Sequence, residues 1–192
     1  MPIKNVELIP GYIYHIYNRA VEGNLLFREW ANYGFFLGKI RQYLLPEAEL
    51  YAYCLMPNHY HFLIKITNQN FPEAMQKLAL SYVVAYNKRY NRRGRLFDSP
   101  YQRLHIKNIS HLLELTRYIH LNPIRAGLTI SPLDWDYSNY AEFVGVKEVE
   151  FTNPTFILDL LSDGLSSTLT EQYQTYREFI QDKINELKDE VP

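Results

Sequence analysis

The feature that most constrains this chain is the order in which strand-like and helix-like segments follow one another. Residues 50–56 and 60–67 are two apolar runs joined across Pro57-Asn58, a dipeptide typical of tight turns, so they predict two paired strands. Further segments flank this pair, with strands predicted over 12–17 and within 95–107 and helices over 29–45, 71–93 and 110–121. The order strand, helix, strand, strand, helix, strand predicts an α+β fold with a ferredoxin-like antiparallel sheet. Helices on one face of that sheet would leave the other face free for a site.

The chain changes character beyond residue 130, which predicts a main body over 1–130 and a helical, acidic extension over 131–192 that packs on it. Pro123 is expected to end the helix over 110–121, because the residue before a proline is pushed out of the helical region. Near the C-terminus, Thr168 and Glu171 fit a capping box at a helix start. Apolar residues then recur at helical spacing: Leu169, Tyr173, Tyr176, Ile180, Ile184 and Leu187.

Composition excludes several classes of protein. With 192 residues and 47% apolar content, the chain can bury one real core and is not disordered. No apolar run approaches the ~18 residues that a membrane span needs, and the N-terminus lacks the apolar segment of a secretory signal. Cys54 is the single cysteine, so no disulfide can form within the chain. Together these features predict a cytoplasmic protein without a membrane partner.

The near-neutral net charge of −1 conceals an uneven distribution. Residues 1–126 contain 16 Lys and Arg against eight Asp and Glu, whereas the remainder contains four against 13. The densest basic stretch, residues 88–95, interleaves cations with a tyrosine, which suits phosphate contacts and base stacking. A solvated helix end, whose cations complement the helix dipole, would give the same pattern. The acidic C-terminal helix is likewise open to two interpretations, as a competitor of DNA for the basic face or as a cap over core surface.

Two histidines and a tyrosine–asparagine pair carry the most specific chemistry. His59 and His61 are two apart on a predicted strand, so both imidazoles project from one face and can hold one divalent metal, although an exposed strand face would look the same. Tyr118 and Asn122 are four apart on a predicted helix and share a face. A phenol is a possible nucleophile for phosphoryl transfer and an amide oxygen a possible metal ligand. An ordinary core or surface tyrosine is the alternative, because the chain has 17 tyrosines.

Several separated motifs, spread over roughly residues 10–140, resemble a known family. They are Tyr14-His15-Ile16-Tyr17-Asn18-Arg19, Pro57-Asn58-His59-Tyr60-His61, Gly94-Arg95-Leu96-Phe97 and Tyr118-Ile119-His120-Leu121-Asn122-Pro123. In this order they resemble the single-tyrosine HUH transposases, and most of all the REP-associated tyrosine transposases, which are relatives of the insertion-sequence-200-like family.

The resemblance implies an activity and a set of roles. Family members cut and rejoin single-stranded DNA at hairpin-bearing repeats, so residues 1–130 would form the catalytic domain. His59 and His61 would hold Mg²⁺ or Mn²⁺, and Asn122 falls where the family places a third, polar ligand. Tyr118 would attack the phosphate and leave a 5′-phosphotyrosine and a free 3′-OH, which can later reverse the step without ATP.

Further residues are assigned from their positions in the sequence. His15, on the first strand, would contact DNA or support the histidine pair, and His120 should face away from the site and be structural. The expected phosphate contacts come from a group of arginines: Arg89, Arg92, Arg93, Arg95, Arg103 and Arg125.

Three functional classes stay open at this point. The leading one is a metal-dependent transposase that nicks and joins single-stranded or hairpin DNA. A domesticated, non-catalytic protein that binds DNA hairpins is the second, and a metal hydrolase of another phosphodiester, with Tyr118 incidental, is the third. The chain could act as a monomer, with Tyr118 serving its own histidines, or as a homodimer that exchanges tyrosine helices.

Overall fold

The computed structural model describes residues 6–162 and 168–189. The expectation about the N-terminal segment therefore lies partly outside the described residues, as do Asp163 and Glu190 of the acidic extension. The elements in chain order are β1 (Ile13–Arg19), α1 (Trp30–Lys39) with a π-helical turn (Ile40–Leu44), β2 (Ala48–Met56), β3 (His59–Ile66), α2 (Phe71–Arg89), β4 (Gln102–Ile106), α3 (Ile109–Arg125), a 3₁₀ turn (Pro132–Asp134), α4 (Tyr140–Phe143), α5 (Pro154–Leu161) and α6 (Leu169–Asp189).

The four strands form one antiparallel sheet in the order β2-β3-β1-β4. This is the ferredoxin-like order, in which the first strand is inserted beside the third and pairs with the fourth on its other edge. The fold class predicted from the order of elements is thus confirmed. The tight turn at Pro57-Asn58 lies where expected, between β2 and β3.

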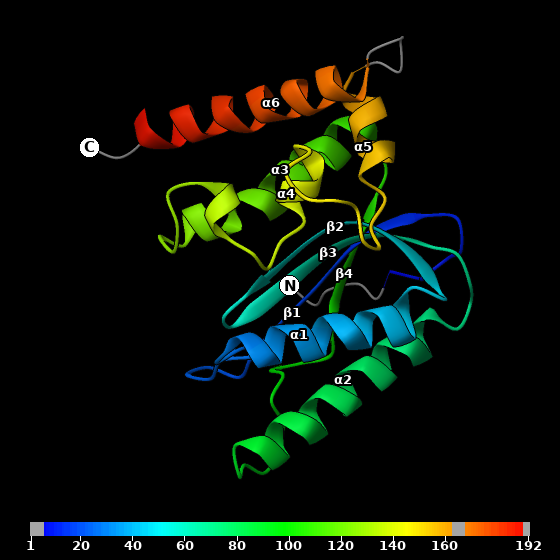
Figure 1. Ribbon diagram of the computed structural model, residues 1–192. Helices are drawn as coiled ribbons and strands as arrows, with labels where there is room; N and C mark the ends of the chain where they lie inside the picture. Colours follow the sequence, from blue (N-terminus) through cyan, green and yellow to red (C-terminus); the bar gives the residue numbers. More distant parts are fainter. Residues whose placement is uncertain (1–5, 163–167, 190–192) are drawn as a thin grey trace.

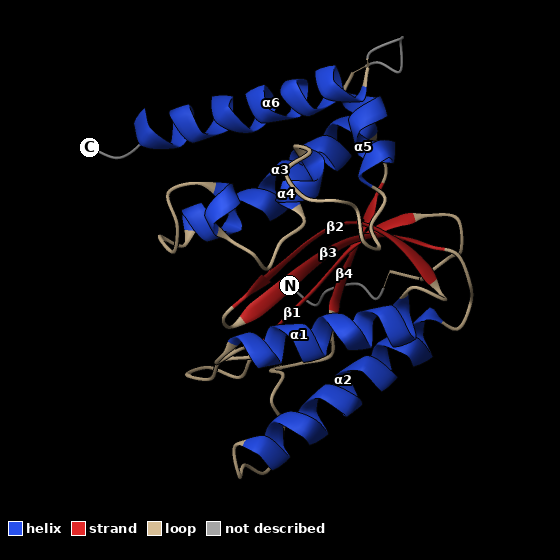
Figure 2. Cartoon of the chain, viewed as in Figure 1, coloured by secondary structure: helices blue, strands red, loops and turns tan. Residues whose placement is uncertain are grey.

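Helices cover both faces of the sheet, which corrects the expectation of one free face. Figure 1 shows α1 and α2 below the sheet and α3 to α6 above it, and Figure 2 shows the strands as the layer between. Two separate apolar cores result. One joins α1 and α2 to alternate strand residues such as Ile16 and Phe62, and the other joins α3 and the C-terminal helices to residues such as Leu63. Periodicity identifies a helix but does not state which face of the sheet it covers, so the extension was expected to pack on the main body without a prediction of which face it would cover.

Two helix ends differ from prediction. The helix α2 ends at Arg89 rather than near residue 93, because the chain enters a left-handed turn at Asn91 (φ 48°) before Gly94 (φ 87°). The helix α3 runs through Pro123 to Arg125, so the expectation that Pro123 ends it was wrong. A proline close to the last turn costs few backbone hydrogen bonds, and the carbonyls of Asn122 and Pro123 still accept from Ala126 and Leu128.

The C-terminal extension packs into the second core. The predicted capping box is present, since the backbone N–H of Thr168 donates to Glu171 Oε2 (2.6 Å) and that of Glu171 donates to Thr168 Oγ1 (3.3 Å). Along α6, Tyr176, Ile180 and Ile184 are buried among residues of β2, β3 and α3. This burial supports the interpretation of α6 as a cap over core surface.

A buried polar network joins the extension to α3. His120 Nε2 lies 3.0 Å from Asn139 Oδ1, and His120 Nδ1 lies 2.7 Å from the Tyr176 hydroxyl. The Asn139 amide also donates to the Tyr51 carbonyl (2.9 Å) and accepts from the Tyr53 N–H (2.9 Å). These bonds fix the amide orientation, so His120 Nε2 donates to Asn139 and Nδ1 accepts from Tyr176. His120 is fully buried, as expected of a structural histidine, and burial lowers its pKa to about 4.

Within the described residues, no helix combines the length and the apolar character needed to cross a membrane.

We expect Tyr176→Phe to lower the free energy of unfolding by about 1–3 kcal/mol, measured by urea denaturation, because His120 Nδ1 would be left buried without a donor. The matched control is Tyr173→Phe on the same helix, whose hydroxyl makes no hydrogen bond within the described part of the chain, and which should change stability by less than about 0.5 kcal/mol. Equal effects of the two substitutions would show that the hydrogen bond contributes nothing specific.

Candidate active site

The site begins with two neighbouring strands that present their side chains on the same face of the sheet. In the antiparallel register of β1 and β3, Tyr17 lies opposite His61 and Arg19 opposite His59. Because side chains alternate along a strand, His15 and Tyr17 project on the same side as His59 and His61. Leu63, two residues further along β3, belongs to the core under α3, so this is the face that α3 covers.

The histidines form a tight cluster on that face. His15 Nε2 lies 2.9 Å from His61 Nδ1, and the two rings lie side by side, 21° from parallel, with centroids 5.1 Å apart. The rings of His59 and His61 meet edge to face at 5.0 Å. His61 is 6% exposed, and its Nε2 is buried with no hydrogen-bond partner among the described residues. The second nitrogen of His61 is therefore an unsatisfied polar atom inside the cluster.

Burial keeps these imidazoles neutral. It lowers the pKa of His61 to about 2, with smaller contributions from the adjacent His15 and His59. It also lowers the pKa of His15 to about 4, with His111 adding to the effect, and lowers that of His59, against a hydrogen bond with Asn122 that raises it. A neutral imidazole keeps a lone pair on one nitrogen, which is the form that ligates a metal.

The helix α3 brings the tyrosine and the asparagine to the histidines. The ring of Tyr118 meets that of His61 edge to face at 5.5 Å, and 37% of the Tyr118 surface stays exposed. One turn later, Asn122 donates from Nδ2 to the Tyr118 carbonyl (2.9 Å), and its side chain lies near enough to His59 to raise the pKa of that imidazole. All four residues singled out for catalysis and metal binding thus meet within one chain.

The donor set is compatible with one divalent cation, although it is small. No group of three His, Cys, Asp or Glu side chains suited to a metal occurs in residues 6–162 and 168–189. The available donors are two imidazoles and one amide, from His59, His61 and Asn122. The partnerless Nε2 of His61 supports the fit, because a buried nitrogen lone pair with no donor nearby is what a metal would satisfy.

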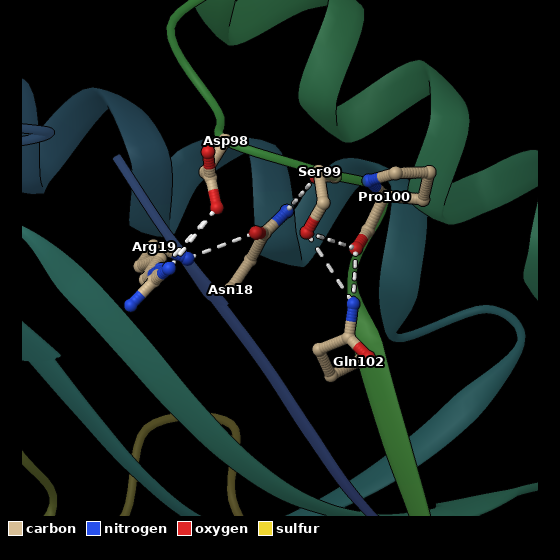
Figure 3. A network of polar contacts seen from close by, with 6 residues as sticks. All are labelled: Asn18, Arg19, Asp98, Ser99, Pro100 and Gln102. Atoms are coloured by element: carbon tan, nitrogen blue, oxygen red, sulfur yellow. Dashed lines mark hydrogen bonds and ion pairs between the residues drawn. The ribbon is translucent and has the colours of Figure 1, made fainter. Parts of the chain in front are cut away.

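A cavity of about 560 Å³ opens in front of the cluster and is lined by both histidines and Tyr118. Figure 3 shows the polar network on one side of it, in which Arg19 pairs with Asp98 (3.2 Å) and Asn18 donates to the Ser99 carbonyl (3.2 Å). The sequence did not predict this polar lining of the cavity, because the segment before β4 approaches β1 only in the folded chain. The remaining lining residues are Tyr17, Asn58 and Gln102.

Several side chains of the basic stretch at the end of α2 bind other residues of the protein, which its sequence does not suggest. Arg89 forms an ion pair with Glu29 (2.6 Å), and Arg92 donates to Asn24 (2.9 Å). Tyr86 is buried, and the Tyr90 hydroxyl contacts Glu29. The two tyrosine rings therefore pack against the protein's own arginines rather than facing outward, whereas the exposed cations of this stretch are Lys88, Arg89, Arg93 and Arg95.

The other expected DNA contacts lie in different surroundings. Arg125 is exposed, and its guanidinium lies 5.6 Å from the centre of the Tyr118 ring. Arg103, on β4, is half-buried and lies 6.0 Å from the centre of the Tyr101 ring. His15, expected at the DNA or behind the histidine pair, is 7% exposed and touches His61.

Comparison with known proteins shows what this chain is similar to. Residues 38–122 match the family model described as "Transposase IS200 like", a span that contains both histidines, Tyr118 and Asn122. This match confirms the resemblance to the insertion-sequence-200-like transposases. The matched span begins near the end of α1 and ends at Asn122 within α3, so it leaves out β1, most of α1 and everything after α3.

A solved structure described as a "REP associates tyrosine transposase bound to a REP hairpin" is similar in fold. The likeness has a TM-score of 0.65 and covers 80% of this chain and 98% of the other, at 15% sequence identity. Among curated proteins, none matches the chain.

Proposed function

We propose that this chain is a metal-dependent transposase that cuts and rejoins single-stranded DNA beside hairpin repeats through a covalent phosphotyrosine. The observation that carries the proposal is the contact between the ring of Tyr118 and that of His61 within one chain. Tyr118 is partly exposed and lies beside two neutral imidazoles at the mouth of a cavity. It is therefore placed to meet a phosphate that is bound to the metal ion held by the histidines. The solved transposase of similar fold, bound to a REP hairpin, supports DNA hairpins as the substrate class.

The reaction consists of two exchanges at phosphorus. The Tyr118 oxygen attacks the scissile phosphate and its proton passes to water, which reaches the exposed part of the side chain. The bond from phosphorus to the 3′ oxygen breaks, and that oxygen leaves as a 3′-OH after taking up a proton. A 3′-OH then attacks the phosphotyrosine, restores a phosphodiester and releases the tyrosine. Each exchange replaces one phosphate ester by another, so the cycle needs no nucleotide cofactor.

His59, His61 and Asn122 would hold the Mg²⁺ or Mn²⁺ ion. When bound, such an ion supplies charge that polarises the phosphate and stabilises the transition state. The residues themselves orient the nucleophile, because Asn122 donates to the Tyr118 carbonyl and its side chain lies near that of His59. This arrangement places the helical turn that carries the nucleophile beside the strand that carries the histidines.

The site supports a monomer that acts in cis. The two histidines, the tyrosine and the asparagine converge without a residue from a second copy. The buried network through His120 joins α3 to the sheet and to α6 of the same chain.

The first prediction concerns the nucleophile. A 3′-fluorescent pool of single-stranded oligonucleotides, each with a hairpin beside randomised unpaired sequence, should give a labelled protein band on a denaturing gel. We expect Tyr118→Phe to abolish this band and to leave binding in a gel shift nearly unchanged. The matched control is Tyr17→Phe, because Tyr17 lines the same cavity.

The outcomes of this experiment separate the functional classes. An adduct that survives Tyr118→Phe but not Tyr17→Phe would mean that the nucleophile is wrongly assigned. Binding of the pool without any adduct, in the wild-type protein, would favour the non-catalytic hairpin-binding protein. Cleavage without protein-linked DNA would favour a metal hydrolase.

The second prediction concerns the metal. We expect His59→Ala and His61→Ala each to weaken Mn²⁺ binding in calorimetry by roughly 100-fold or more, since each removes a ligand. His105→Ala is the control, because His105 pairs with Tyr14 and lies on the opposite face of the sheet, and it should leave the affinity unchanged. Unchanged Mn²⁺ affinity in the first two variants would remove the metal role of the histidine pair.

The third prediction concerns the basic surface. Affinity for an oligothymidine strand should fall as the salt concentration rises. The double variant Arg93→Gln, Arg95→Gln should reduce the slope of the logarithm of the association constant against the logarithm of the salt concentration by roughly 0.7 for each phosphate that the protein no longer neutralises. Arg89→Gln should have a smaller effect, because its guanidinium is already paired with Glu29. Fluorescence anisotropy over a salt series measures both, and a flat affinity would overturn the electrostatic contribution.

A further inference from the structure

The ring of His15 has no role in the reaction described above, and it is the partner of a candidate metal ligand. It lies on β1, diagonally across from His61 on β3, and both residues are more than nine-tenths buried. Its Nε2 lies 2.9 Å from His61 Nδ1. Its ring stacks on that of Tyr17 (centroids 4.7 Å apart) and lies side by side with that of His61 (centroids 5.1 Å apart), so both neighbours restrain it.

A hydrogen bond between two neutral imidazoles needs one N–H and one lone pair, so the two rings have linked tautomers. If His61 donates from Nδ1, its Nε2 carries a lone pair. If His15 donates instead, His61 must carry its proton on Nε2, where no acceptor lies among the described residues. A buried N–H without an acceptor is the rarer and costlier of these two arrangements.

We propose that His15 is a positioning residue that accepts the Nδ1–H of His61 and thereby holds the Nε2 lone pair of His61 toward the metal position. The inference rests on the proposed function for the identity of the metal, but the tautomer it assigns belongs to the chain itself. Metal-bound histidines commonly donate their other ring N–H to a carboxylate, a carbonyl or water. In this chain a second imidazole takes that place.

The strand that supplies His15 lies outside the segment that carries the other site residues. The family match over residues 38–122 does not include β1, so His15 comes from beyond the matched span. The antiparallel register sets His15 opposite Leu63 and Tyr17 opposite His61, which leaves the diagonal position for the hydrogen bond. His15 thus acts on the site through His61 and does not need to reach DNA.

Three substitutions at one position test the assignment. In His15→Gln the amide oxygen reaches about as far as Nε2 and can accept the same hydrogen bond. In His15→Asn the amide is too short, and in His15→Phe the ring keeps its stacking but offers no acceptor. Melting temperatures of the three variants show whether each is folded before any other measurement is interpreted.

The first readout uses the metal-free protein and no DNA. Nitrogen-15 NMR of the His61 imidazole at neutral pH shows which ring nitrogen carries the proton. We expect the Nδ1–H form in the wild-type protein and in His15→Gln, and a mixture of both forms in His15→Phe and His15→Asn. Finding Nε2–H in the wild-type protein, or an unchanged tautomer in all variants, would overturn the proposal.

The second readout is Mn²⁺ affinity by calorimetry. We expect about a 10–100-fold loss in His15→Phe and His15→Asn, and a change of only a few-fold in His15→Gln. Equal losses in all three would mean that the ring matters only for packing. If the wild-type protein binds no Mn²⁺, the proposed function fails while the tautomer result stands. If Mn²⁺ binds equally to all variants, the inference about His15 fails while the proposed function stands.

Discussion

One side chain, that of Asn139, ties together the parts on which the site depends. Its amide bonds the backbone of β2 at both Tyr51 and Tyr53, and its oxygen receives the N–H of His120 from α3. His120 in turn accepts the hydroxyl of Tyr176 from α6. Since His120 lies between Tyr118 and Asn122 in sequence but faces the other way, the same helix is anchored on one side and presents the nucleophile on the other.

The arrangement of the site residues within each strand or helix was predictable from the sequence, whereas the way in which these elements come together was not. Spacing alone places His59 with His61 on a strand and Tyr118 with Asn122 on a helix, because strand and helix periods are fixed by backbone geometry. The partner of His61 depends on the register between β1 and β3, which are separated by a helix and another strand, and no local pattern encodes it. In the same way, sequence identified α3 but not the face of the sheet that it covers.

The pattern of charges predicted a basic surface at the end of α2, where Lys88, Arg93 and Arg95 are exposed, whereas the pattern of aromatic residues was misleading about stacking. The interleaved stretch at the end of α2 looked like a platform for unpaired bases, yet Tyr86 bonds the Leu25 carbonyl (2.6 Å) and is buried, and Arg28 lies 4.7 Å from the centre of the Tyr90 ring. Cation and ring contacts that suit nucleic acid also suit the protein itself. Figure 1 shows this end of α2 on the same side of the molecule as the β2–β3 turn, but α2 covers the face of the sheet opposite to the one that carries the histidines.

The acidic extension is better understood as part of the scaffold than as a detachable inhibitor. Removing α6 would uncover Ile180 and Ile184 along with Tyr176, and would leave His120 without its donor, so a truncated protein would lose stability as well as negative charge. A gain or loss of DNA binding in such a truncation would therefore mix two causes. The helix also lines a groove of about 300 Å³ against α3, in which Lys183 lies with Arg125 and Tyr118. Lys183 is paired with Glu186 and Glu114 also lines this groove, so acids and cations alternate where α6 meets α3, and α6 does not present a purely acidic surface there.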